Sequence, residues 1–191
     1  MPDYDNTREE FKQAVTSTMR AISGVEELDV SFGKGEPFMQ GGRARLPLSD
    51  EILSEEELAT LRGVADKLAL NSRFHDEKVH TRCRPNSIPA QEVFDSLENA
   101  RIACIGANLM KGVENNLRAE LQHRCVQQGF AAIEHQSHAP ISLALGLYIR
   151  EKITGSPSPS AARKILDFWY DHIKENISLD VSLLSDLLFQ Q

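Results

Sequence analysis

The sequence predicts a mainly α-helical fold, with about six to seven helices and a small β-hairpin near the N-terminus. Apolar residues recur at the helical spacings i, i+3 and i+4 along most of the chain. Only one segment, ELDVSF at 27–32, alternates polar and apolar residues as a strand does. No shift in composition marks a second domain, so residues 1–191 are expected to form a single helical domain.

The first elements are predicted from local signals. Thr7 and Glu10 have capping-box spacing, so the first helix is expected to begin after Thr7 and to end at Gly24. Segment 27–32 favours a strand, and the GKGEP sequence after it is typical of a turn. The run RARL at 43–46 is then expected to pair back on the first strand as a hairpin, although the glycines before it weaken the strand signal.

The remainder of the chain is predicted to be helical. Ser54 and Glu57 form a second capping-box pattern, and Pro89 suits the first turn of the helix after it. Gly129 and Gly155 are expected to end two later helices. The helices after Pro89 are expected near 90–104, 113–129, 141–155, 160–173 and 178–188.

The helix after Pro89 carries polar residues on its apolar face. At about 100° per residue, Arg101 and Asn108 fall about 40° and 20° from Leu97, so both are expected to point into the packing face. Because buried charges are normally paired, Arg101 is expected to be largely buried and bonded to a carboxylate or to backbone carbonyls. The alternative is that Arg101 lines a cleft for an anionic group.

A His/Arg-rich turn precedes this helix, and it contains the candidate metal ligands. His75 and His80 are five residues apart, about 140° on a continuous helix, and therefore need a turn to meet. Cys83 would be a third ligand. These spacings do not supply a closed set of four ligands, so we expect no tightly bound metal and keep the three residues as weak candidates.

Four arginines form a further candidate surface. They are Arg43, Arg45, Arg82 and Arg84. Scattered solvated charges are the simpler interpretation. The alternative is a face that binds an anion or a partner protein. Together with His75, His80, Arg101 and Asn108, these arginines are the candidate partner-binding or ligand-binding residues.

Composition and motifs exclude several classes of function. The net charge of −7 is unfavourable for binding nucleic acid. The apolar run ISLALGLYI at 141–149 is too short to span a bilayer, and the N-terminus lacks a signal-peptide pattern. Three widely spaced cysteines are typical of reduced thiols, so a cytoplasmic location is expected. The chain shows no phosphate-binding loop, G-x-S-x-G or H-E-x-x-H motif, and no catalytic residue is assigned.

Several segments, in order, resemble a known family. They are GGRARLP at 41–47, TLRGVADKLAL at 60–70, HDEKVH at 75–80 and VFDSLENARIACIGANLMKGVENNL at 93–117. The resemblance is to the N-terminal region of the T subunit of aerobic, ATP-dependent cobaltochelatase, and it covers roughly residues 10–190. Such T subunits continue into an acidic linker and a von Willebrand factor A domain. This chain has neither, so we interpret it as the N-terminal piece of a longer subunit.

The resemblance implies a role in cobalamin biosynthesis. The enzyme inserts cobalt into hydrogenobyrinic acid a,c-diamide with ATP hydrolysis. ATP, Mg²⁺ and cobalt belong to the whole complex, in which an AAA+ ATPase subunit hydrolyses ATP and a large subunit chelates the metal. The chain itself is expected to hold no cofactor.

Three hypotheses of function follow. The first is a non-catalytic assembly and coupling module of that complex. The second is a direct binding site for the corrin precursor or cobalt around His75, Arg84 and Arg101. The third is an unrelated helical adaptor. A pocket on which these three residues converge favours the second hypothesis, and a broad exposed apolar surface favours the first.

Overall fold

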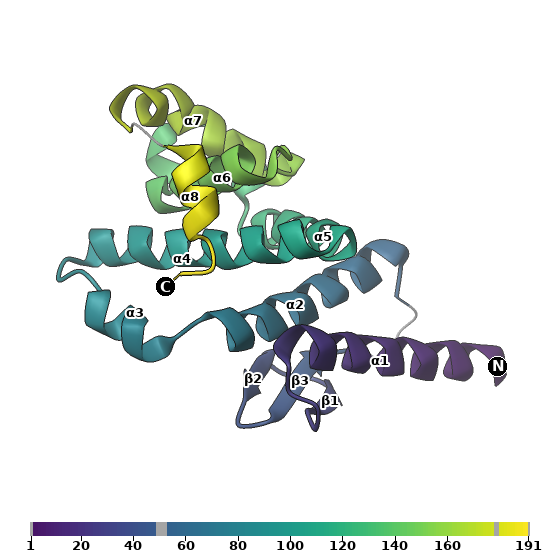
Figure 1. The fold of residues 1–191 in the computed structure, drawn as a ribbon. Coiled ribbons are helices and arrows are strands. Elements are labelled where there is room, and N and C mark those ends of the chain that lie inside the picture. The colour runs from purple at the N-terminus through teal and green to yellow at the C-terminus, as the bar shows by residue number, and fades with distance from the viewer. Residues whose placement is uncertain (1, 49–52, 178–179, 191) are drawn as a thin grey trace.

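The computed structural model describes residues 2–48, 53–177 and 180–190, and this part of the chain contains eight α-helices and one three-stranded sheet (Figure 1). The helices are α1 (Pro2–Ser23), α2 (Glu55–Phe74), α3 (Glu77–Cys83), α4 (Ile88–Leu109), α5 (Lys111–Gln127), α6 (Ile141–Thr154), α7 (Ser160–Asn176) and α8 (Val181–Leu187). The strands are β1 (Asp29–Gly33), β2 (Phe38–Gln40) and β3 (Arg43–Pro47). The predicted mainly α fold with a small N-terminal β element is therefore confirmed.

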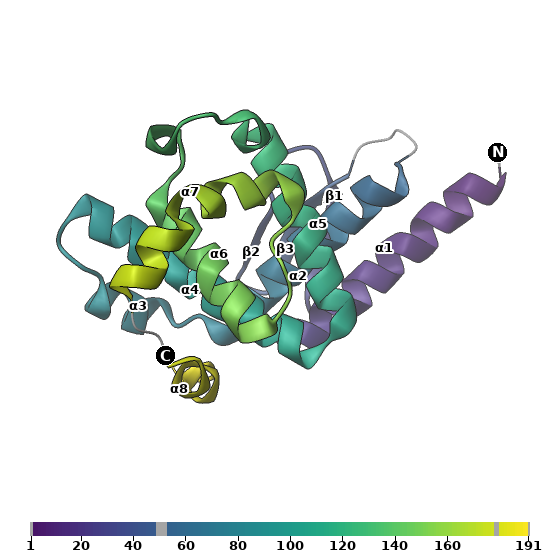
Figure 2. The same cartoon turned by 90° about the horizontal axis from the view of Figure 1, so that it is seen from above.

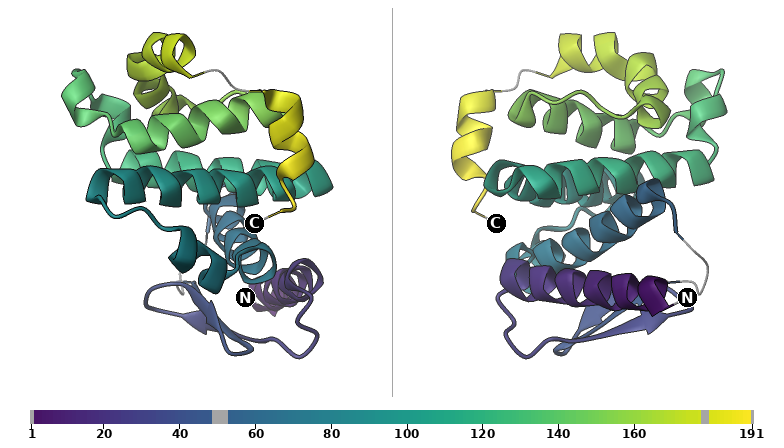
Figure 3. Two further views of the ribbon diagram at one scale, coloured as in Figure 1. Left: turned by 60° about the vertical axis from the view of Figure 1, so that its left-hand side comes forward. Right: turned by 90° about the vertical axis from the view of Figure 1, so that its right-hand side faces the viewer.

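The elements are stacked in layers. In Figure 1 the sheet and α1 lie at the bottom, α2 lies above them, α4 and α5 form the next layer, and α6 and α7 form the top. Seen from above, the N-terminal half of α1 projects beyond the stack (Figure 2). Helix α8 runs along one end of α6 and α4 (Figure 3).

The sheet has a different strand pairing from the predicted hairpin. Its order is β1–β3–β2, with β1 parallel to β3 and β2 antiparallel to β3. The predicted pairing of 27–32 with 43–46 as a hairpin was therefore wrong in direction. The hairpin joins β2 to β3 through Gly41 and Gly42, which have φ values of 59° and 75°. Two successive positive φ angles suit a tight hairpin turn, so the glycines that weakened the prediction are what forms the turn.

Some helix boundaries also differ from the prediction. Helix α1 begins at Pro2, so Thr7 lies inside it and does not cap it. The segment predicted as a His/Arg-rich turn contains the short helix α3, whose N-terminus is capped by the side chain of Asp76. The capping box of Ser54 and Glu57 is confirmed. Ser178, the predicted start of the last helix, lies outside the described residues, and Asp180 caps α8.

Helix α4 is buried on more than one side because it contacts α2, α5 and α6. Its buried residues are Ala100, Ile102, Cys104, Ile105, Gly106 and Ala107, which run around the helix. A single apolar face therefore does not describe this helix. Asn108 is exposed near its C-terminal end, so the prediction that Asn108 points into the packing face was wrong.

Helices α2 and α5 cross closely at Gly63. A Cβ atom on Gly63 would lie 2.2 Å from the carbonyl oxygen of Asn116. We expect Gly63→Ala to lower the free energy of unfolding by about 1–3 kcal/mol, because backbone must move to relieve the overlap. Gly112→Ala is the matched control in α5, since its Cβ meets nothing within 4 Å and should be neutral or stabilising. Urea denaturation measures both, and equal effects would contradict the close crossing.

The same interface buries a carboxyl group that the sequence analysis missed. Asp66 on α2 is 2% exposed and accepts a hydrogen bond of 2.7 Å from Nδ2 of Asn116 on α5. Burial raises the pKa of Asp66 to about 6, while Asn116 and the charge of Arg62 oppose that rise.

No described helix is long and apolar enough to cross a bilayer.

Candidate functional site

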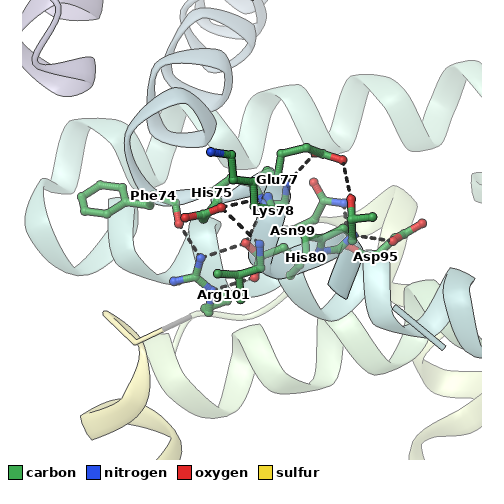
Figure 4. A network of polar contacts seen from close by, with 12 residues as sticks. Phe74, His75, Glu77, Lys78, His80, Asp95, Asn99 and Arg101 are labelled. Carbon is green, nitrogen blue, oxygen red and sulfur yellow. Dashed lines mark hydrogen bonds and ion pairs between the residues drawn. The ribbon is translucent and has the colours of Figure 1, made fainter. Parts of the chain in front are cut away.

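The candidate site lies where the end of α2, the short helix α3 and the first half of α4 meet (Figure 4). His75 is the C-terminal cap of α2, and its backbone N–H donates to Asn71. Asp76 then caps α3 by accepting from the backbone N–H groups of Lys78 and Val79. The two caps fix the reversal between α2 and α3, and they place His75 and His80 with their ring centroids 4.8 Å apart.

Arg101 is the centre of this polar cluster. Its Nε and one terminal nitrogen donate to the two carboxylate oxygens of Glu98, at 2.7 and 2.8 Å. The guanidinium also donates to the backbone oxygens of Phe74 at 2.6 Å and Leu188 at 2.7 Å. The side chains of Arg101 and Glu98 are only 15% and 12% exposed. The prediction of a largely buried Arg101 with carboxylate and carbonyl partners is confirmed.

The two histidines bind separate carboxylates. His75 contacts Glu98 through Nδ1 at 2.9 Å and Glu77 through Nε2 at 3.2 Å. His80 contacts Asp95 through Nε2 at 2.8 Å. The His80 ring also stacks on Phe94, and its Nδ1 is buried without a hydrogen-bond partner in the described residues.

The remaining candidates lie around this cluster or apart from it. Arg84 pairs with Asp95 at 2.8 Å and is nearly half exposed. Arg82 and Cys83 are exposed at the end of α3. Arg43 is exposed on β3, whereas Arg45 donates to the backbone of Glu36 and lies over the ring of Phe38. The four arginines thus belong to two separate elements, and two of them already have partners.

The charges of the cluster shift the pKa values of its members. Burial lowers the pKa of His75, but the hydrogen bonds and charges of Glu98 and Glu77 outweigh it, so the net shift is upward. Burial likewise raises the pKa of Glu98, but hydrogen bonds from Arg101 and His75 outweigh it, so the net shift is downward. Both shifts favour the charged forms, so His75 and Glu98 stabilise each other as an ion pair.

The raised pKa of His75 predicts a pH-dependent contribution to stability. A histidine whose pKa is higher in the folded state stabilises the fold below its unfolded pKa of 6.5, and this contribution disappears as the pH rises through the folded value. We therefore expect the stability difference between wild type and His75→Gln to be larger at pH 6 than at pH 8.5. Thermal melts at both pH values test this, with His172→Gln, an exposed histidine on α7, as the control. A difference that does not change with pH would contradict the assignment.

The arrangement is poorly suited to bind a metal or an anion. A pocket of about 360 Å³ opens beside the cluster, lined by Asn71, His75, Glu77, His80, Arg84, Asp95, Glu98 and Asn99. Its two histidines and its arginine each already contact a carboxylate of Glu77, Glu98 or Asp95. In the described residues no three His, Cys, Asp or Glu side chains are grouped to hold a metal ion. Absence of bound metal stays a prediction, and metal analysis of chelator-treated protein tests it: stoichiometric zinc or cobalt would contradict it.

The sequence analysis missed the carboxylates of this cluster. Glu98 precedes Arg101 by three residues on one helix, and that spacing places two side chains on the same face. This signal was available in the sequence. The pairing of Asp95 with His80 and Arg84 depends on how α3 folds back on α4, and no local pattern predicts it.

Comparison with known proteins gives the family. No solved structure matches the chain. A family model described as "Cobalamin biosynthesis protein CobT" matches residues 5–191. That range includes the whole of α2 through α8, the polar cluster and the sheet. Because the match covers nearly the entire chain, the protein belongs to the CobT family of cobalamin biosynthesis proteins.

Proposed function

We propose that this chain is a non-catalytic assembly and coupling module of cobaltochelatase, acting in the cytoplasm. Its partners are the AAA+ ATPase subunit and the large chelating subunit, and the complex inserts cobalt into hydrogenobyrinic acid a,c-diamide with ATP hydrolysis. Membership of the CobT family supports the cobalamin pathway and a subunit of this enzyme. Assembly, and not chemistry, is favoured because Arg101, Glu98 and His75 at the centre of the polar cluster are already bonded to one another or to backbone oxygens.

The observation that carries this proposal is the outer face of α8. The inner side of the segment is anchored by Leu188, which is 4% exposed and packs with Cys104 and Ile105 of α4. Leu183 and Leu187 lie one turn apart on the same helix and are 54% and 39% exposed. Phe189 follows and is 59% exposed. A helix that is apolar on its inner and outer sides presents a surface that a partner protein can bury.

The rival function is a corrin-precursor or cobalt site at the polar cluster. The pocket beside His75 and Arg84 favours it. Arg101, however, is turned to Glu98 and to backbone oxygens, and Arg101 does not line that pocket. An incoming carboxylate would have to displace the hydrogen bonds that Arg101 already makes. The hypothesis of a corrin-precursor or cobalt site therefore has the weaker support.

A pull-down with the two other chelatase subunits, with and without nucleotide, tests the proposal. We expect the chain to retain at least one subunit, and we expect Leu183→Lys/Leu187→Lys to abolish that retention. Ile88→Lys is the matched control, because Ile88 is a 72% exposed aliphatic residue at the start of α4. Binding that survives the α8 double variant, or that fails equally in the control, contradicts a docking role for α8. Retention of neither subunit by the wild type contradicts the proposal as a whole.

The same pull-down can test whether the charge of Arg82 contributes to subunit binding. It is an exposed cation on an acidic chain, so a contribution to docking should weaken with salt. Arg82→Glu should weaken subunit binding without changing the melting temperature. Arg84→Glu is expected to lower both subunit binding and the melting temperature, because Arg84 also pairs with Asp95.

A further inference from the structure

A second pocket among the described residues lies apart from α8, and it shares Asn71, Asp95 and Asn99 with the pocket beside the polar cluster. It has a volume of about 650 Å³ and is lined by residues of α2, α4, α5 and α6, with Pro37 at its edge. Much of its wall is aliphatic, including Leu68, Leu143 and Leu147. This volume and this lining are typical of sites for small organic ligands. We call it the α2–α6 groove.

One cation in the wall of this groove has no partner. Arg150 on α6 lines the groove, and its guanidinium has no hydrogen bond or ion pair within the residues that the structure describes. Burial lowers the pKa of Arg150, as expected for a charge withdrawn from water. Arg150 is partly buried, and its guanidinium carries five donor hydrogens that no group in the described residues accepts.

The two carboxylates whose charges act on Arg150, Glu114 and Glu120, have other partners. Glu114 binds Lys111 and the hydroxyl of Ser156. Glu120 binds Lys67 and Arg124. Their charges act on Arg150 through space, but neither forms an ion pair with it. The guanidinium therefore remains available to an anion that enters the groove.

From these observations we propose that the α2–α6 groove binds a small carboxylic acid with an apolar body, whose carboxylate pairs with Arg150. The aliphatic wall takes the apolar body, and Arg150 accounts for a preference for the anion over a neutral analogue. A carboxylate suits this position because a guanidinium offers two parallel N–H groups to its two oxygens. The site is independent of subunit docking, because none of its lining residues belongs to α8.

The test compares naphthalene-1-acetate with its neutral analogue naphthalene-1-acetamide by isothermal titration calorimetry on the 191-residue chain. We expect the acid to bind about tenfold or more tightly than the amide, since a hydrogen-bonded pair of opposite charges is stronger than a hydrogen bond to a neutral amide. Arg150→Met should remove this preference and leave amide binding unchanged. Arg150→Lys should keep part of it, because the charge remains.

Two controls make the outcome decisive. Arg118→Met removes a nearby, partly buried arginine that donates to the backbone oxygen of Pro157, and it should leave both affinities unchanged. Thermal melts establish that Arg150→Met is folded, which we expect because the variant removes a partly buried charge that has no ion-pair partner among the described residues. Equal binding of acid and amide, no binding of either, or unchanged acid binding in Arg150→Met would each overturn the proposal.

Discussion

Arg101→Met is expected to lower the free energy of unfolding by about 3–5 kcal/mol, as removal of one partner from a buried ion pair does. Methionine fills a similar volume, so the loss comes from the groups that Arg101 leaves behind. Glu98 would remain largely buried with only His75 as a partner, and the backbone oxygens of Phe74 and Leu188 would each lose a donor. Arg101 also ties the segment after α8 to α4, so α8 should loosen as well.

Urea denaturation measures this effect, and a surface arginine provides the control. Arg163 is 43% exposed and pairs with Glu151 and Asp167, so Arg163→Met should cost about 1 kcal/mol or less. The double variant Arg101→Met/Glu98→Gln should recover part of the loss, because it removes the stranded charge. If Arg101→Met lowers the free energy of unfolding no more than Arg163→Met does, Arg101 does not hold α4 to the end of α2 and to the segment after α8.

Asp66→Asn is expected to change the pH dependence of stability by about 3 kcal/mol. The pKa of Asp66 is raised from an ordinary 3.8 to about 6, and this difference corresponds to about 3 kcal/mol. Because the folded state binds the proton more tightly than the unfolded state, this group costs stability as the pH rises from about 4 to about 6. Asparagine cannot ionise, and its side-chain oxygen can still accept the hydrogen bond from Asn116.

The measurement is the difference in unfolding free energy between Asp66→Asn and wild type at pH 4 and at pH 8. That difference should move in favour of the variant by about 2–2.5 kcal/mol, because the unfolded carboxyl group is already partly ionised at pH 4 and other titrating groups cancel between the two proteins. Asp167→Asn, at a side chain that is 55% exposed, should show no such change. A pH-independent difference for Asp66→Asn would show that burial does not raise the pKa of the Asp66 carboxyl group.

The features that the sequence predicts correctly are those with a local signal, such as helix starts and helix ends. The capping box of Ser54 and Glu57 and the first-turn proline Pro89 are local patterns, and both are found. Gly129 and Gly155 end helices in the left-handed conformation, as glycine permits. The burial of Arg101 was also predictable, because a charge three and four residues from apolar neighbours must find partners.

What the sequence did not predict depends on how elements meet. The parallel pairing of β1 with β3 results from two chain reversals, and apolar alternation does not encode strand direction. Asp66 is buried because α5 covers that side of α2, and the periodicity of α2 alone places no partner there. Asn108 is exposed because α4 ends within two residues of it, where a packing face inferred from a longer straight helix no longer applies.

Under the proposed function, residues 1–191 couple the ATPase subunit to the chelating subunit. Cobalt insertion by cobaltochelatase reconstituted with a T subunit that carries or lacks these residues tests this coupling. We expect the deletion to abolish subunit association and cobalt insertion, while the ATPase subunit alone still hydrolyses ATP. Full assembly and undiminished cobalt insertion without residues 1–191 would contradict it.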